Sequence, residues 1–259
     1  LIGDGDTYEW GLKIADLNND TYADIAVGNG ALSQMQIYIN DGTGNFPSFS
    51  AISMPSIGSG HGNLDVGDID GDGDIDLVVP GNAGDAFYTL INDGVANFSG
   101  PNNFAGSSAN DYEELAIGDV NSDTFLDVVA TSPNGNAVDI FLGDGAGNFN
   151  LDVAHSASSP LGVVLKDVNH DSSREIIYTQ VFGDVIIIDY AEHLLDTIST
   201  SQPQYVRVED INLDGEQDII FSDLSVNGIR VALGNGSGYD SPVDYYVNND
   251  PTGLAVKDF

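Results

Sequence analysis

The chain has 259 residues, with 41 acidic side chains against six lysines and arginines and a formal net charge of −35. Such a charge repels nucleic acid and anionic membrane surfaces, so we expect neither as a partner. The absence of cysteine excludes a disulfide framework, and no apolar run approaches the ~18 residues of a membrane-inserted helix.

The first of five similar units shows the order of the predicted elements. An alternating apolar segment at 12–15 predicts a first strand, and an acidic nine-residue loop follows at 16–24. The apolar run 25–27 predicts a buried second strand, and residues 36–40 predict a third. A glycine-containing turn at 40–46 then leads into a less regular fourth strand. Each acidic loop is therefore expected at the tip of a hairpin.

The same order recurs four more times along the chain. First strands are predicted at 64–67, 115–118, 163–166 and 206–209, second strands at 77–79, 128–130, 176–178 and 219–221, and third strands at 87–92, 138–143, 184–189 and 229–234. Glycine turns follow at 92–98, 143–149 and 234–240, whereas the fourth unit has residues 189–198 in that place. The acidic loops, here named loops one to five, are 16–24, 68–76, 119–127, 167–175 and 210–218. Their starts lie 52, 51, 48 and 43 residues apart.

A four-stranded unit that repeats about every 40 to 50 residues is typical of a β-propeller blade. A β-helix of calcium-binding nonapeptides would need a far shorter period, and an array of β-sandwiches a period about twice as long. The sequence therefore predicts an all-β fold, with residues 1–259 forming a single β-propeller domain whose five blades are centred on the five loops.

The spacing of polar side chains within the loops predicts calcium sites. Oxygen-bearing side chains at positions 1, 3, 5 and 9, together with the backbone carbonyl of position 7, can converge on one Ca²⁺ ion, which accepts about six to eight oxygen ligands. The predicted ligand positions are Asp16, Asn18, Asp20, Tyr22 and Asp24 in loop one; Asp68, Asp70, Asp72, Asp74 and Asp76 in loop two; Asp119, Asn121, Asp123, Phe125 and Asp127 in loop three; Asp167, Asn169, Asp171, Ser173 and Glu175 in loop four; and Asp210, Asn212, Asp214, Glu216 and Asp218 in loop five. About five Ca²⁺ ions, one for each loop, are expected.

Other metals and other calcium motifs fit the loops less well. No imidazole or thiolate recurs at a fixed loop position, which argues against zinc and copper, and magnesium requires a tighter octahedron. An EF-hand needs a bidentate Glu at position 12, where this chain has Val27, Val79, Ala130, Tyr178 and Phe221. We expect loop two, with its four ligand carboxylates, to bind most tightly and loop four to bind most weakly.

The acidic loops, each followed by an apolar strand, and the GxGxF turns at 42–46 and 145–149 resemble the FG-GAP/VCBS repeats of integrin α-chains and of many secreted bacterial proteins. The resemblance covers the whole chain and implies a calcium-binding β-propeller whose complete ring has seven blades. Residues 254–258 match residues 12–16, so a further blade is expected to start at 254–259. Loop position 6, usually glycine in this family, is Thr21, Thr124 or Ser172 in three loops, which we expect to be strained.

The resemblance and the composition together imply an extracellular or cell-surface protein in which calcium replaces disulfides as the stabilising element. Adhesion or recognition is the function that we expect. A lectin-like carbohydrate-binding propeller and the non-catalytic scaffold of a secreted polysaccharide-degrading enzyme are the alternatives. The chain has no cysteine nucleophile, no GxSxG and no HExxH motif, and its four histidines fall at unrelated points of the repeat, so we do not expect an enzyme.

The connections into the first strands differ from unit to unit, and they should lie around the central channel on the face opposite the acidic loops. Loops on a rigid scaffold commonly carry binding residues, so a protein or glycan ligand is expected there. The aromatic side chains could stack on a sugar or anchor a protein, or they could merely cap the hydrophobic end of the ring. The candidate ligand-binding residues are Tyr8, Trp10, His61, Tyr112, Glu113 and Tyr205.

Overall fold

The structure, a computed structural model, describes residues 9–55, 63–81, 85–107, 112–247, 251 and 254–256. The strands of these residues form five antiparallel sheets of four strands each, and the strands of every sheet pair in the order of the sequence. Blade one contains β1 (Glu9–Ala15), β2 (Asp24–Asn29), β3 (Gln34–Tyr38) and β4 (Phe49–Ser53); blade two contains β5 (Asp65–Gly67), β6 (Asp76–Pro80), β7 (Asp85–Asn92) and β8 (Phe98–Ala105); blade three contains β9 (Glu114–Gly118), β10 (Asp127–Ser132), β11 (Ala137–Gly143) and β12 (Phe149–Ser156); blade four contains β13 (Pro160–Lys166), β14 (Glu175–Gln180), β15 (Val185–Ile188) and β16 (Leu194–Ile198); and blade five contains β17 (Pro203–Glu209), β18 (Asp218–Asp223), β19 (Gly228–Ala232) and β20 (Val243–Tyr246). A short 3₁₀ helix, η1 (Leu224–Val226), joins β18 to β19.

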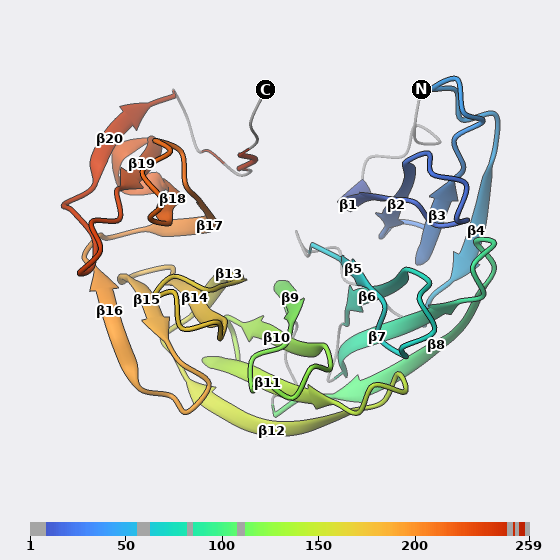
Figure 1. The fold of residues 1–259 in the computed structure, drawn as a ribbon, viewed down its shortest axis with the longest axis horizontal. Helices are drawn as coiled ribbons and strands as arrows, with labels where there is room; N and C mark the ends of the chain where they lie inside the picture. Colours follow the sequence, from blue (N-terminus) through green and yellow to red (C-terminus); the bar gives the residue numbers. More distant parts are fainter. Residues whose placement is uncertain are drawn as a thin grey trace.

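The five blades follow one another along an open arc (Figure 1). The first strand of each blade lies near the centre of the arc, and the fourth strand lies at its periphery. The prediction of an all-β protein with four-stranded propeller blades is therefore confirmed. Closure into a ring, and with it the total of seven blades, stays a prediction. Of the segment 254–259, residues 254–256 are not in a strand, and residues 257–259 lie outside the described part.

The hydrophobic core consists of layers between neighbouring blades. Leu77 and Tyr88 of blade two pack with Met35 and Ile37 of blade one, and three similar clusters join the remaining neighbours. The second strands are buried on both faces, which explains why the sequence gives them continuous apolar runs rather than an alternating pattern. Because each blade buries its faces against its neighbours, the fold is stabilised by contacts between adjacent repeats.

The inner strand of blade one differs from its counterparts in exposure. Leu12 and Ile14 are 50% and 62% exposed, whereas Leu64 and Val206, which occupy the place of Leu12 in blades two and five, are fully buried at 0%. In the later blades these positions pack against the preceding blade. Leu12 and Ile14 are thus the side chains that an additional neighbouring blade would bury.

The fourth unit lacks the glycines of the turn between its third and fourth strands, β15 and β16, but keeps the hydrogen bond of that turn. The Asp189 amide donates to the His193 carbonyl (3.2 Å), and Glu192 adopts a left-handed backbone with φ 63°. The same bond closes the glycine turns of blades one to three, so the interruption of the pattern changes the residues of the turn and preserves the blade.

Candidate metal centres

All five acidic loops connect the first and second strands of their blades and lie side by side on one face of the arc. Position 4 of one loop contacts position 7 of the next at three places along this face. Asn19 Nδ2 donates to Asp74 Oδ1 (2.6 Å), the hydroxyls of Ser122 and Ser173 lie 3.3 Å apart, and His170 Nε2 lies 3.3 Å from Glu216 Oε2. The loops are therefore linked from blade to blade.

The loops share one backbone conformation. Positions 4 and 6 have positive φ in every copy, with φ 64° and 78° at Ser122 and Thr124 and φ 81° and 94° at Gly71 and Gly73. A left-handed conformation costs a residue with a side chain about 1–2 kcal/mol relative to glycine. Thr124, like Thr21 and Ser172, therefore introduces the backbone strain that was expected where this chain departs from the family pattern.

The side chain at position 1 closes each loop through hydrogen bonds. In loop one, Asp16 Oδ1 accepts from the Asp20 amide (3.1 Å) and Asp16 Oδ2 accepts from the Thr21 amide (2.7 Å). The side chains at positions 3 and 5 accept from backbone amides two residues further on, as Asp20 Oδ1 does from Tyr22 (2.8 Å). These bonds fix the side-chain oxygens of positions 1, 3 and 5 against the loop backbone, although three carboxylate oxygens converge within 4.8 Å only in loop two among the described residues.

The carboxylate at position 9 is buried in all five loops and ties two segments of its blade together. In loop two, Asp76 Oδ2 accepts from the Ile69 amide (3.0 Å), and Asp76 Oδ1 accepts from the Asn92 amide at the start of the glycine turn (2.8 Å). Loops one, three and five repeat both bonds. Each oxygen has a second lone pair, so this structural role leaves metal coordination possible.

Loop four meets the same requirement in a different way. Glu175 Oε2 accepts from the Val168 amide (2.8 Å), but its Oε1 accepts from Asn169 Nδ2 (3.0 Å) instead of from a turn amide. The longer glutamate side chain thus takes its second hydrogen bond from its own loop, whereas the other position-9 carboxylates take it from the residue before the turn.

Loop two brings the most carboxylates together. One oxygen from each of Asp68, Asp70 and Asp76 lies within 4.8 Å of the other two. Oxygens that share one Ca²⁺ at about 2.3–2.6 Å lie up to about 5 Å apart, so the set fits that ion. Burial raises the pKa of Asp76 to about 6, with smaller contributions from the charges of Asp70 and Asp72. A cation placed among these oxygens would reverse that effect.

Loop four holds an oxygen that also fits a cation. Asp167 Oδ1 is buried and has no hydrogen-bond partner among the described residues. In loop one, the equivalent oxygen of Asp16 accepts from a backbone amide. A charged oxygen that lacks both water and a donor is costly, and a coordinated metal ion is one way to satisfy it.

The side chains at position 7 explain the glycine turns, to which the sequence analysis gave no function. A Cβ on Gly145 would lie 2.3 Å from a ring carbon of Phe125, and a Cβ on Gly42 would lie 2.8 Å from the ring of Tyr22. Both glycines also have positive φ, of 68° and 80°. Position 7 was predicted to offer only its carbonyl, and its side chain additionally packs on the turn of its own blade.

The residues predicted to bind a ligand at the channel have different environments. Tyr8 and His61 lie outside the described residues, and Trp10 lies in β1 with its side chain outside the described part. Glu113 is half-buried, as is Tyr205, whose pKa is raised to about 12 by burial and by the charges of Glu114 and Glu113. The two side chains therefore lie in one region of the structure, and the presence of a ligand site there stays a prediction.

Tyr112 was predicted at an accessible connection, but it is buried at 4% exposure. Its hydroxyl donates to the buried carboxylate of Asp139, and its ring packs in the cluster that contains Phe87 and Phe141. The expectation of an accessible ring at this position is therefore wrong. The reason is that Tyr112, just before β9, packs into the apolar layer between blades two and three.

Glu114 is the residue of this face that the sequence analysis missed. Its Oε1 accepts from Asn63 Nδ2 (2.8 Å) and lies 3.5 Å from Arg207 Nη1, and its Oε2 accepts from the Val163 amide (3.0 Å). The buried carboxylate thus joins blades two, three, four and five, and burial raises its pKa despite the arginine. The signal in the sequence that could have identified Glu114 is its position, an acidic residue at the start of an otherwise apolar strand.

Comparisons with known proteins agree with this architecture. A family model described as "FG-GAP-like repeat" matches residues 16–79 and 68–130, which include loops one to three. No curated protein sequence matches the chain. No helix in the described ranges is long and apolar enough to cross a membrane.

Solved structures resemble the chain in fold at low sequence identity. BBS1N in complex with ARL6DN, in a crystal soaked with lead, aligns with a TM-score of 0.63 at 15% identity, covering 90% of this chain and 67% of BBS1N; in a crystal soaked with mercury the values are 0.58, 15%, 86% and 63%. The V. cholerae biofilm matrix protein Bap1 aligns with a TM-score of 0.58 at 16% identity, covering 93% of this chain and 40% of Bap1. The chain thus spans about two thirds of BBS1N and less than half of Bap1. Its blades are β-propeller blades, and residues 16–130 are similar to the FG-GAP-like repeat.

Proposed function

We propose that the protein is a calcium-stabilised β-propeller that acts as an extracellular or cell-surface adhesion or recognition module. The observation that carries the calcium part is the convergence of the Asp68, Asp70 and Asp76 oxygens within 4.8 Å. The unpartnered Asp167 oxygen adds support from a second loop. Bound Ca²⁺ would supply positive charge that offsets repulsion among the carboxylates of each loop.

The chain's own residues would use that charge to hold the inner hairpin of each blade. The side chain at position 1 fixes the loop backbone, and the carboxylate at position 9 ties the loop to the start of the glycine turn. A cation bound to both side chains would therefore link the loop before the second strand to the turn after the third strand. Metal binding of this kind contributes directly to folding stability because the unfolded chain has no preformed site.

The recognition part is supported by the two kinds of relatives. One similar structure is a protein in complex with another protein, and one is a biofilm matrix protein. On this chain we place the partner, a protein or a glycan, on the channel face, where Glu113 and Tyr205 are half-buried. Trp10, Tyr8 and His61 remain candidates on the same connections. No catalytic role is proposed.

Calcium titration by calorimetry tests the metal sites. Replacement of Asp70 by asparagine should remove or greatly weaken one site, because it takes a charged ligand from loop two. Replacement of Asp74 by asparagine is the matched control, since it removes the same charge from the same loop at a position that offers only its carbonyl. Equal calcium stoichiometry and affinity in both variants would contradict the assignment of a calcium site to loop two.

Recognition needs a separate experiment. The calcium-loaded chain should be screened on a glycan array and against extracellular proteins, with Tyr205→Ala as the variant of the channel face. A glycan hit that this variant abolishes would select the lectin-like alternative, and a protein hit would select adhesion. Binding that Tyr205→Ala leaves unchanged would show that the partner does not use this part of the face.

A further inference from the structure

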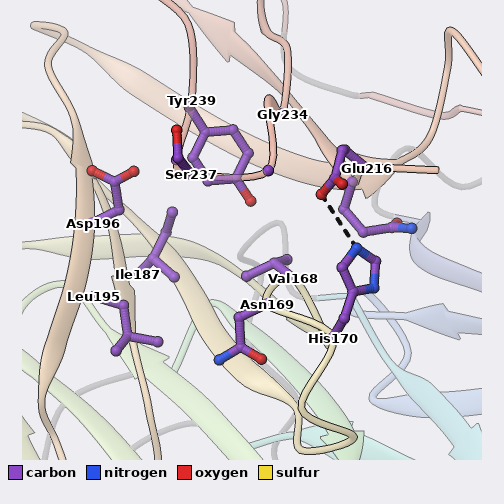
Figure 2. A pocket seen from close by; sticks show the side chains of 13 residues that line it. Val168, Asn169, His170, Ile187, Leu195, Asp196, Glu216, Gly234, Ser237 and Tyr239 are labelled. Carbon is purple, nitrogen blue, oxygen red and sulfur yellow. Dashed lines mark hydrogen bonds and ion pairs between the residues drawn. The ribbon is translucent and has the colours of Figure 1, made fainter. Parts of the chain in front are cut away.

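A cavity of about 290 Å³ lies between blades four and five on the side of the acidic loops. Val168, Ile187 and Leu195 form its apolar wall. Figure 2 shows Asp196 on one side of the open space and Glu216 on the other, with the ring of Tyr239 between them. The volume is at the lower end of the roughly 300–1,000 Å³ of ligand pockets, so one small group would fill it.

Contacts that close other junctions on this face are missing here. Between blades one and two, Asn92 Nδ2 donates to the Leu17 carbonyl (2.8 Å), and between blades two and three the Gly147 amide donates to the Ile69 carbonyl (3.1 Å). The corresponding acceptor in loop four is the carbonyl of Val168. The described part of the chain gives that carbonyl no such bond, and Val168 instead lines the cavity.

The turn of blade five explains the opening. The Asn235 amide donates to the Gly238 carbonyl (3.1 Å), three residues ahead, whereas the Asp93 amide in blade two reaches the Asn97 carbonyl, four residues ahead. In addition, Gly234 has no side chain at the place where blade two has Asn92. The tighter turn with the smaller residue leaves room between the two blades.

The cavity is electronegative. Burial raises the pKa of Tyr239 above its usual range, and the charges that raise it further include those of Asp196 and Glu216, which line the cavity. The Tyr239 hydroxyl has no hydrogen-bond partner among the described residues and points toward the open space (Figure 2). An anionic ligand would be repelled, and a neutral ligand would desolvate the carboxylates without compensating their charge.

We propose that this cavity binds a cationic nitrogen carried on a short aliphatic stem. The nitrogen would lie in the open space between the carboxylate of Asp196 and that of Glu216, which also lies 3.3 Å from His170 Nε2. The Tyr239 hydroxyl would face the nitrogen, and the stem would lie against Leu195 and Ile187. A lysine side chain of a partner protein and a free aliphatic amine both present this chemistry. The site is separate from the channel face and does not depend on the function proposed above.

Calorimetric titration of the calcium-saturated chain at about 0.15 M salt tests the site, because that salt concentration screens exposed charges beyond about 8 Å. The probes are n-butylammonium and its neutral counterpart 1-butanol. Asp196→Asn and Glu216→Gln should each weaken n-butylammonium binding about tenfold, the effect of roughly 1.4 kcal/mol. Glu209→Gln, which removes one charge from an exposed side chain outside the cavity, should leave the affinity unchanged. A melting curve for each variant confirms that the fold is intact.

Binding of 1-butanol with the same affinity would overturn the proposal, as would n-butylammonium binding that all three variants leave equal. Displacement of bound n-butylammonium by further Ca²⁺ would identify the cavity as a divalent-cation site and would also overturn the proposal. The affinities of N-acetyl-lysine methylamide and N-acetyl-norleucine methylamide distinguish a lysine side chain of a partner protein from a free amine as the natural ligand. Binding of the lysine derivative supports a protein partner, and binding of n-butylammonium alone supports a free amine.

Discussion

Removal of calcium should reverse the way in which stability depends on pH, and Asp76 is the residue that shows why. In the calcium-free protein, burial raises the pKa of this carboxyl from 3.8 to about 6. The folded state therefore holds a proton that the unfolded state has lost between about pH 4 and pH 6, and stability increases as the pH falls through this range. Asp24, Asp127 and Glu175 also have pKa values raised by burial, so they act in the same direction.

The magnitude follows from the shift. About two pKa units at ~1.36 kcal/mol each give up to about 3 kcal/mol for Asp76 between about pH 7 and pH 4. With calcium bound, the cation favours the ionised carboxylates, so stability should instead be highest at neutral pH and decrease on acidification. The free energy of unfolding is thus expected to change with pH in opposite directions in the calcium-free and the calcium-loaded protein.

Urea unfolding of calcium-stripped and calcium-loaded protein, followed by circular dichroism at several pH values, measures both slopes. In the calcium-stripped protein, Asp76→Asn should reduce the change in unfolding free energy between about pH 7 and pH 4 by up to about 3 kcal/mol, because asparagine does not titrate. A stripped protein that is more stable at neutral pH than at about pH 5 would refute the reasoning. An unchanged slope in Asp76→Asn would show that the buried carboxyl does not carry the effect.

Three further predictions follow from the loops and the channel face. Thr124→Gly should raise the free energy of unfolding by about 1 kcal/mol in chemical denaturation, because it removes a left-handed residue that has a side chain. Gly145→Ala should lower the melting temperature, and Phe125→Ala in the same chain should restore part of the loss if the ring contact is the cause. Tyr112→Ala should destabilise the fold by about 3–5 kcal/mol in chemical denaturation, because it removes a buried aromatic side chain. Glu114→Ala should also destabilise the fold, because it leaves the Val163 amide without its acceptor and the partly exposed Arg207 without its carboxylate partner; unfolding curves close to those of the unmodified chain would contradict both burial assignments.

The sequence by itself determined the blade. The acidic loops, the apolar second strands and the period of the repeat are local features, and each blade forms between strands that are consecutive in the chain. Because the loop is closed by its own side chains, as Asp16 closes loop one, its composition is enough to predict where it lies in the blade.

Only the tertiary structure decided which side chains meet between blades and where a cavity remains. Tyr112 and Glu114 are neighbours of an exposed-looking connection in the sequence, yet both are buried because they meet residues from other blades, such as Arg207, which lies 93 residues away. The cavity beside Tyr239 arises from the way in which one tighter turn faces the loop of the preceding blade. A local pattern repeats in the chain, but the contact between two copies depends on side chains from both, and no single repeat contains that information.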